Sequence, residues 1–217
     1  MSVSESEAQA APGAGILPVP VRINLGSGKS WHEQFLNIDI SDYWRPDILA
    51  DFNEVFLPPE GRVFETDRFG SVRLRRGQFK HIVAHDVFEH IRELSTCVTN
   101  CLDLLDFGGI LEVLVPHEFS HGAWRDPTHV RAFNEGSWLY YTDWFWWMGW
   151  MDARFELAKL NFEFSELGLE MNKAGADLNL VLRTPRAVDN MHAYLRKIPL
   201  SAEDRAEQAR QMKRPER

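Results

Sequence analysis

Short apolar runs alternate with polar segments along the first half of the chain. Four runs have the length of buried strands: residues 21–25, 36–40, 48–50 and 81–84. Residues 94–105 instead place apolar side chains at helical spacing, and the following Gly-Gly pair at 108–109 predicts the end of that helix. Residues 110–115 form another apolar run. This alternation predicts an α/β domain with a parallel sheet flanked by helices.

The pattern changes in the second half of the chain. Residues 154–164 and 178–183 predict two longer strands joined by a glycine-containing turn, which we expect to form an antiparallel hairpin at one sheet edge. Residues 61–79 intersperse arginine with phenylalanine and leave two interpretations open, a hairpin insertion or a covering loop.

Composition sets the expected domain limits. Residues 1–15 are rich in Ser, Glu, Ala and Gly and predict a disordered leader. The chain turns polar after Pro185, so we expect one domain over residues 16–184 and a polar C-terminal tail over residues 185–217, which could be helical.

Charge and cysteine content narrow the function classes. The 217 residues carry a net charge of −8, from 24 basic and 32 acidic side chains, which argues against a nucleic-acid-binding surface. The two cysteines, Cys97 and Cys101, are four apart in a predicted helix, which is typical of a reduced, cytoplasmic protein. No secretion signal and no apolar stretch of membrane-spanning length are apparent, so we expect no membrane span.

A Gly-x-Gly turn follows the first predicted strand, at Gly26 and Gly28, and the second strand ends in Asp39. Glycine lets the backbone approach a ligand, and an acid at the next strand end can accept hydrogen bonds from a ribose. A dinucleotide motif would need a third glycine where Trp31 stands, and a phosphate loop would need a glycine in place of Ile23. The turn therefore predicts a different nucleoside-containing cofactor.

Five segments, in order, resemble the motifs of class I S-adenosylmethionine-dependent methyltransferases of the type 11-like group. They are residues 23–28 (INLGSG), 37–40 (NIDI), 46–52 (PDILADF), 81–91 (HIVAHDVFEHI) and 108–116 (GGILEVLVP). His81 departs from the family, which usually has an acid at the start of the fourth strand. The resemblance implies a Rossmann-like sheet of seven strands, mostly parallel with an antiparallel last strand at the edge, and helices on both faces.

The same resemblance implies that S-adenosyl-L-methionine is the cofactor. Asp39 would hold its ribose, Asp51 and Phe52 would contact the adenine, and His85 would line the methionine end. The full set of expected cofactor-binding residues is Asn24, Gly26, Ser27, Gly28, Asp39, Ile40, Asp51, Phe52, His85 and Asp86.

The expected activity is methyl transfer to a small-molecule or sugar-like acceptor. A hydroxyl or amine acceptor must lose a proton, and histidine is the usual base near neutral pH. His117 and His129 are the predicted bases, with Asp126 as a partner. A second interpretation is that Asp126 and His129 only cap the next helix and fix the loop.

Two other functions stay open. Residues 117–121 match His-Glu-x-x-His, the motif of zinc hydrolases, with His117 and His121 as ligands and Glu118 as base. The motif follows a buried strand directly and has no long helix to lie on, so we predict no metal ligands, while a metal that only assists methyl transfer stays open. The other alternative is a non-catalytic cofactor-binding protein that works as a partner in a larger assembly.

Five of the eight tryptophans fall between residues 138 and 150. This aromatic segment predicts a core helix on the sheet, with one face left for a substrate pocket, a homodimer contact or a membrane surface. We favour the pocket or the homodimer contact.

Overall fold

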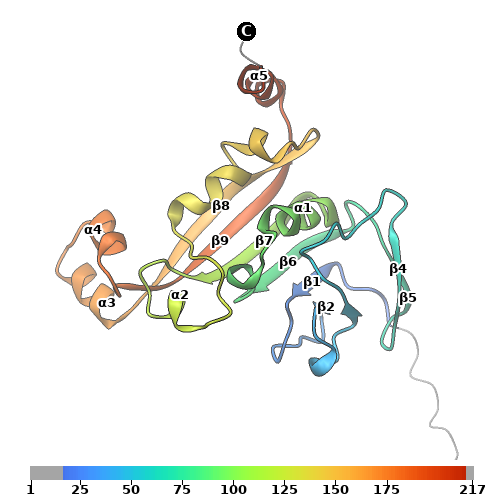
Figure 1. Ribbon diagram of the computed structural model, residues 1–217, viewed down its shortest axis with the longest axis horizontal. Coiled ribbons are helices and arrows are strands. Elements are labelled where there is room, and N and C mark those ends of the chain that lie inside the picture. The colour runs from blue at the N-terminus through green and yellow to red at the C-terminus, as the bar shows by residue number, and fades with distance from the viewer. Residues whose placement is uncertain (1–16, 214–217) are drawn as a thin grey trace, which may run out of the picture.

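The computed structural model describes residues 17–213, so the leader predicted for residues 1–15 lies outside the described part of the chain. Its centre is a seven-stranded sheet with the order β3-β2-β1-β6-β7-β9-β8 (Figure 1). The strands are β1 (Arg22–Leu25), β2 (Leu36–Asp39), β3 (Ile48–Leu49), β6 (Phe79–His85), β7 (Leu105–Pro116), β8 (Ala153–Phe164) and β9 (Val188–Pro199).

The strand directions confirm the expected fold class. β3, β2, β1, β6 and β7 run parallel to one another, whereas β9 is antiparallel to both of its neighbours, β7 and β8. The antiparallel strand is the last in the chain, and it lies one position in from the edge strand β8. The five parallel strands therefore bring their carboxyl ends to one side of the sheet, where open α/β sheets bind ligands.

The prediction of a strand at residues 178–183 is wrong, because these residues form the helix α4 (Leu178–Arg183). Asp177 caps this helix by accepting a hydrogen bond from the backbone N–H of Asn179. Val181 and Leu182 are its buried side chains. A run of six mostly apolar residues fits either a strand or a short helix, and the capping aspartate decides for the helix.

The predicted tail over residues 185–217 is also wrong in its first part. Residues 188–199 form β9, which pairs with β7 and β8 inside the sheet. The helix suggested for this segment begins later, as α5 (Ala202–Gln211). Met191, Ala193 and Leu195 are buried and alternate with polar residues, which is the pattern of a half-buried strand. The prediction relied instead on the overall polar composition after Pro185.

Helical segments and the core gather on one face of the central strands. The helix α1 (Leu94–Leu104) packs against β7 and buries Cys97, Val98 and Cys101 (Figure 1). The predicted aromatic core helix is replaced by two 3₁₀ segments, η3 (Glu135–Tyr141) and η4 (Phe145–Met148). Trp138 and Phe145 are buried there, whereas Trp147 is exposed.

The remaining elements lie at the periphery. Residues 61–79 contain the hairpin of β4 (Arg62–Thr66) and β5 (Gly70–Leu74), which decides between the two interpretations of that segment. Figure 1 shows α3 (Glu166–Lys173) and α4 at one end of the β8–β9 hairpin and α5 at the other. Short helical turns follow β2, β6 and β7: η1 (Asp42–Trp44), η2 (Phe88–His90) and α2 (Gly122–Arg125).

The opposite face of the central strands is polar and half-exposed. The side chains that alternate with the core residues of β6, β7 and β9 include His81, Glu112, His192 and Tyr194. Residues 26–35, which link β1 to β2, form turns with no α-helix. Helical cover on this face is therefore thinner than the fold class predicts. Among residues 17–213, none of the helices combines the length and apolar character that crossing a membrane requires.

Candidate functional site

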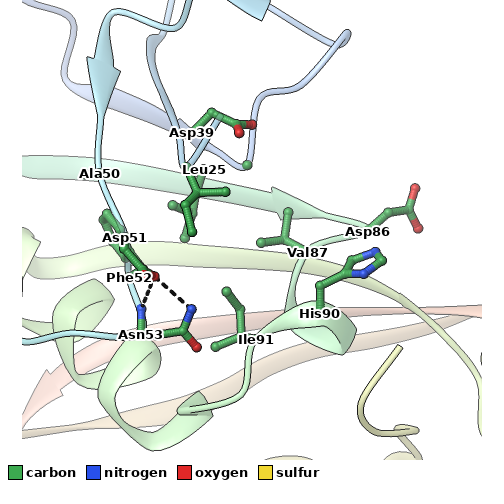
Figure 2. Close-up of a pocket in the computed structure, with 12 residues that line it drawn as sticks. Leu25, Asp39, Ala50, Asp51, Phe52, Asn53, Asp86, Val87, His90 and Ile91 are labelled. Atoms are coloured by element: carbon green, nitrogen blue, oxygen red, sulfur yellow. Dashed lines mark hydrogen bonds between the residues drawn. The ribbon is translucent and has the colours of Figure 1, made fainter. Parts of the chain in front are cut away.

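The carboxyl ends of β1, β2 and β6 and the segment after β3 surround a cavity of about 270 Å³. Figure 2 shows Asp39, Asp51 and Asp86 around it, with His90 and Ile91 below Asp86. The lining residues are Leu25, Gly26, Asp39, Ile40, Ala50, Asp51, Phe52, Asn53, Asp86, Val87, His90 and Ile91. The cavity thus joins segments from all of the first four predicted motifs.

The glycine turn is shaped by contact with the segment after β6. Gly26 has a φ of +61°, and a Cβ atom at this position would lie 2.4 Å from Cγ2 of Val87. Only glycine fits here without displacing Val87 or straining the backbone. Gly28 also has a positive φ, and its backbone N–H donates to Oδ2 of Asp39 at 2.8 Å. The turn and the second-strand acid therefore form one unit.

Two aspartates at the cavity are held in place by backbone donors. Asp39 accepts a second hydrogen bond, from the backbone N–H of Ser41 to Oδ1. Asp51 accepts at Oδ1 from both the backbone and the side chain of Asn53, as Figure 2 shows. Each carboxylate oxygen has two lone pairs, so both groups keep acceptor sites for a ligand. Their fixed orientation lowers the entropic cost of ligand binding.

The cavity is lined by acidic side chains, without Lys or Arg among its described residues. Asp39, Asp51 and Asp86 line it, and none of its lining residues, all within the described chain, is Lys or Arg. Sites for phosphate groups rely on basic side chains or helix N-termini. Carboxylates without basic partners favour a ligand that is positively charged or rich in hydroxyl and amine donors.

The expected cofactor residues fall into two adjoining cavities. Six of them line the cavity of about 270 Å³: Gly26, Asp39, Ile40, Asp51, Phe52 and Asp86. Asn24 and His85 line a neighbouring cavity of about 420 Å³, which shares Gly26 and Asp86 with the first. Ser27 is buried within the turn between them, and Gly28 bonds to Asp39 beside it.

His90 is held by a chain of hydrogen bonds. The Thr128 hydroxyl lies 2.6 Å from Oδ1 of Asp126 and 2.9 Å from Nδ1 of His90. These hydrogen bonds from Thr128 hold the pKa of Asp126 below its usual range, so Asp126 is an ionised acceptor. The Thr128 proton therefore points to Asp126, and the Thr128 oxygen accepts from Nδ1 of His90. This assignment leaves Nε2 of His90 unprotonated in the neutral ring.

His129 contacts the His90 ring, and Glu89 lies next to His129. The His129 ring packs edge-on against His90, with 4.6 Å between ring centroids. His129 Nδ1 lies 2.9 Å from the carbonyl oxygen of Ala123, and its Nε2 lies 3.9 Å from Oε1 of Glu89. Glu89 is 2% exposed, and burial, reinforced by nearby Asp86, raises the pKa of Glu89 to about 7. The group can therefore hold a proton near neutral pH.

His117, one of the two predicted bases, lies away from both cavities. It is buried against Phe119 and Phe162, and burial lowers its pKa. Its Nε2 is 3.9 Å from Glu135. His117 directly follows β7 and its backbone N–H donates to the carbonyl oxygen of Asp189, but its side chain is buried and lines neither cavity.

The zinc-hydrolase motif is not assembled. Among residues 17–213, two groups of three side chains bring candidate ligand atoms within 4.8 Å of one another, and both groups lack His117, Glu118 and His121. Glu118 instead accepts a hydrogen bond from the Asn134 side chain. The hydrolase alternative therefore has no support.

The sequence prediction missed His90, which lines the cavity, and chose its neighbours. His129 packs on His90, and Asp126 reaches it through Thr128. The signal was present, since Glu89-His90 stands where the resembled family often has Leu-Glu-His after its fourth strand. The spatial meeting of residues 90 and 128 depends on how the loop after β7 folds back, which the sequence pattern does not encode.

No protein-family model matches this chain, and no curated protein matches it. Solved structures do. A SAM-dependent methyltransferase from Archaeoglobus fulgidus superposes with a TM-score of 0.50 at 14% identity, covering 82% of this chain and 86% of that one. An S-adenosylmethionine-dependent methyltransferase from Mesorhizobium loti gives 0.48 at 16% identity, covering 83% and 93%. The [4+2]-cyclase SpnF gives 0.49 at 14%, covering 85% and 77%.

Structural similarity at 14% sequence identity shows a shared fold, and the superposition on the Archaeoglobus fulgidus enzyme is the basis for this statement. The strand order, the antiparallel β9 and the glycine turn at the end of β1 agree with it. The chain has the fold of the class I S-adenosylmethionine-dependent methyltransferases.

Proposed function

We propose that the protein binds S-adenosylmethionine and transfers its methyl group to a small-molecule or sugar-like acceptor. The observation that carries this proposal is the cavity itself, which combines the Gly26 turn with three carboxylates and has no Lys or Arg among its described lining residues. S-adenosylmethionine has a sulfonium cation and an adenosine with hydroxyl and amine donors, so its chemistry complements such a lining.

The cofactor would lie across the two adjoining cavities. Asp39 would accept from the ribose hydroxyls, and Asp51 with Phe52 would contact the adenine. The methionine end would pass Gly26 and Asp86, which line both cavities, toward His85 in the second. S-adenosylmethionine supplies a methyl group on a sulfonium leaving group, so the protein's task is to align the acceptor and exclude water.

His90 is the base that the geometry favours. Its ring lines the cavity, and the Asp126–Thr128 pair fixes the tautomer that leaves Nε2 free to accept a proton. A hydroxyl acceptor beside Nε2 would lose its proton as its oxygen attacks the methyl group. Asp126 and Thr128 act through His90, which makes them positioning residues.

Calorimetric titration of the purified protein tests the proposal. S-adenosylmethionine is expected to bind at one site per chain, and ATP and NAD⁺ are expected to bind much more weakly because their phosphates would meet carboxylates. A folded protein that shows no S-adenosylmethionine binding at millimolar concentration would rule the proposal out.

A turnover assay separates catalysis from binding alone. Release of S-adenosylhomocysteine is measured against a panel of sugar, hydroxy-acid and phenol acceptors. Turnover with one acceptor class supports the proposed methyltransferase activity. Cofactor binding with no turnover on any acceptor of the panel favours the non-catalytic partner role.

A further inference from the structure

A group of polar side chains lies on the half-exposed face of the sheet, outside the cavity that holds His90. His85 ends β6, and His192 lies on β9; both are paired with Leu114 of β7, so the three strands place them in one row. Glu112 precedes Leu114 by two residues on β7 and therefore points to the same face. The sheet register thus brings together two imidazoles and one carboxylate.

The spacing of these groups suits a metal ion. One candidate ligand atom from each of His85, Glu112 and His192 lies within 4.8 Å of the other two. Nε2 of His85 is 3.1 Å from Oε1 of Glu112. Ligand atoms bound at about 2.1 Å to one ion lie roughly 3.0–3.4 Å apart, so this pair already has the required separation.

His192 has a ring nitrogen that is unpaired within the described chain. Its Nε2 atom is buried and has no hydrogen-bond partner among residues 17–213. Its ring centroid is 5.2 Å from that of His85. Buried polar atoms are nearly always paired in native proteins, and an imidazole with an unpaired nitrogen, beside a histidine and a carboxylate, is suited to a metal.

The carboxylate also has a supporting partner. Oε2 of Glu112 is 2.9 Å from Nε2 of His81, on the side away from His85. Metal-binding carboxylates commonly make such an outer hydrogen bond, which fixes their orientation. His81 stands where the resembled family usually has an acid, so this support comes from the chain's departure from the family pattern.

We propose that His85, Glu112 and His192 bind one divalent transition-metal ion, with Zn²⁺ as the ion that fits best. Two imidazoles and one carboxylate suit zinc better than Mg²⁺ or Ca²⁺, which prefer oxygen ligands. His85 and Glu112 line the cavity of about 420 Å³, so a fourth position on the ion would open toward water or a bound molecule. The metal proposal rests on the placement of His85, Glu112 and His192 and can fail or hold separately from methyl transfer, although His85 also borders the path proposed for the methionine end of the cofactor.

Metal binding to the full chain, freed of any purification tag and stripped with chelator, tests the proposal. Zn²⁺ is titrated in competition with a chromogenic chelator, and Co²⁺ substitution is followed by its visible d–d absorption. The expected result is one ion per chain with a dissociation constant below about 10 μM, as ordinary for a three-residue zinc site. A wild-type protein that is folded and binds neither ion at 100 μM, on the order of ten times that constant, overturns the proposal.

Matched variants locate the site. His192→Gln and Glu112→Gln are each expected to weaken Zn²⁺ binding at least about 10-fold, since each removes one of three ligands. His121→Gln, an exposed histidine outside the group, should bind as the wild type does. Circular dichroism confirms that each variant is folded, and Glu112→Gln serves if His192→Gln is not. Suppose instead that His129→Gln loses Zn²⁺ binding while the folded His192→Gln and Glu112→Gln variants keep it. The ion would then lie at Glu89, His90 and His129, and the assignment would be overturned.

Discussion

Two groups of histidine and glutamate lie at the same end of the sheet, yet their surroundings differ. In the first, Nδ1 of His90 and Nδ1 of His129 each have a partner within the chain, and the nearby Glu89 is buried. In the second, the Glu112 carboxylate is bracketed by His81 and His85, and Nε2 of His192 is unpaired within residues 17–213.

In these two groups the partners of each side chain, more than its residue type, determine its chemistry. Fixed tautomers beside a carboxyl with a pKa of about 7 suit proton transfer. A carboxylate oriented between imidazoles suits a metal ion.

Replacing His90 should have the largest effect, because it removes the proposed proton acceptor from the first group. His90→Gln keeps the size and one polar group but removes the base, so kcat on the acceptor identified by the panel should fall about 1000-fold. Steady-state kinetics measure this loss, with His121→Gln as the control that keeps wild-type kcat. A kcat within threefold of wild type would show that His90 is not the base.

The glycine turn is tested by a matched pair of substitutions. Gly26→Ala places a Cβ against Val87, and the displacement should weaken S-adenosylmethionine binding at least about 100-fold. Gly77→Ala is the control, because Gly77 has a similar positive φ of +71° but open space where its Cβ would lie. Calorimetry on both variants separates the clash from backbone strain. Equal affinities in the two variants would contradict the role given to the turn.

The burial of Glu89 predicts a pH dependence of stability. Its folded-state pKa of about 7 lies above the ordinary glutamate pKa of 4.5, so the folded state binds the proton more tightly than the unfolded state does. Stability from this group is therefore complete below pH 4.5 and is lost as the pH rises through about 7.

Glu89→Gln should remove this loss. Relative to wild type, the free energy of unfolding of the variant should rise by about 2–3 kcal/mol between pH 5 and pH 8. Urea denaturation at the two pH values measures the difference. A pH-independent difference would show that Glu89 titrates normally.

The smallest expected effect concerns Thr128. Thr128→Val removes both hydrogen bonds and frees the His90 ring, so kcat should fall about 10-fold with little change in KM, because the ring must be reoriented at each turnover. Thr128→Ser keeps the hydroxyl and should restore kcat. Equal loss in both variants would point to packing rather than to the hydrogen-bond chain.

The cofactor half of the site could be predicted from the sequence because its residues lie within short motifs. Gly26 directly follows β1, Asp39 ends β2 and Asp51 lies two residues after β3, and parallel strands bring such residues to one edge. The base could not be chosen in this way. His90 becomes distinct from the other histidines only through Thr128, which lies 38 residues away in sequence.

The C-terminal half shows the same limit. The polar composition after Pro185 predicts a tail, although His192, Tyr194 and Arg196 alternate with the buried residues of β9. These polar side chains lie on the half-exposed face, where strand alternation permits them. The homodimer contact through residues 138–150 stays a prediction, although exposed Trp147 leaves apolar surface there.

A crystal structure of the protein with bound S-adenosylmethionine, or with its product, would show whether the cavity at Asp39 and His90 is the cofactor site. We expect the ribose hydroxyls within hydrogen-bonding distance of Asp39, the adenine beside Asp51 and Phe52, and the methyl group directed toward Nε2 of His90. Cofactor density that leaves Asp39 uncontacted, or that directs the methyl group away from His90, would contradict the account.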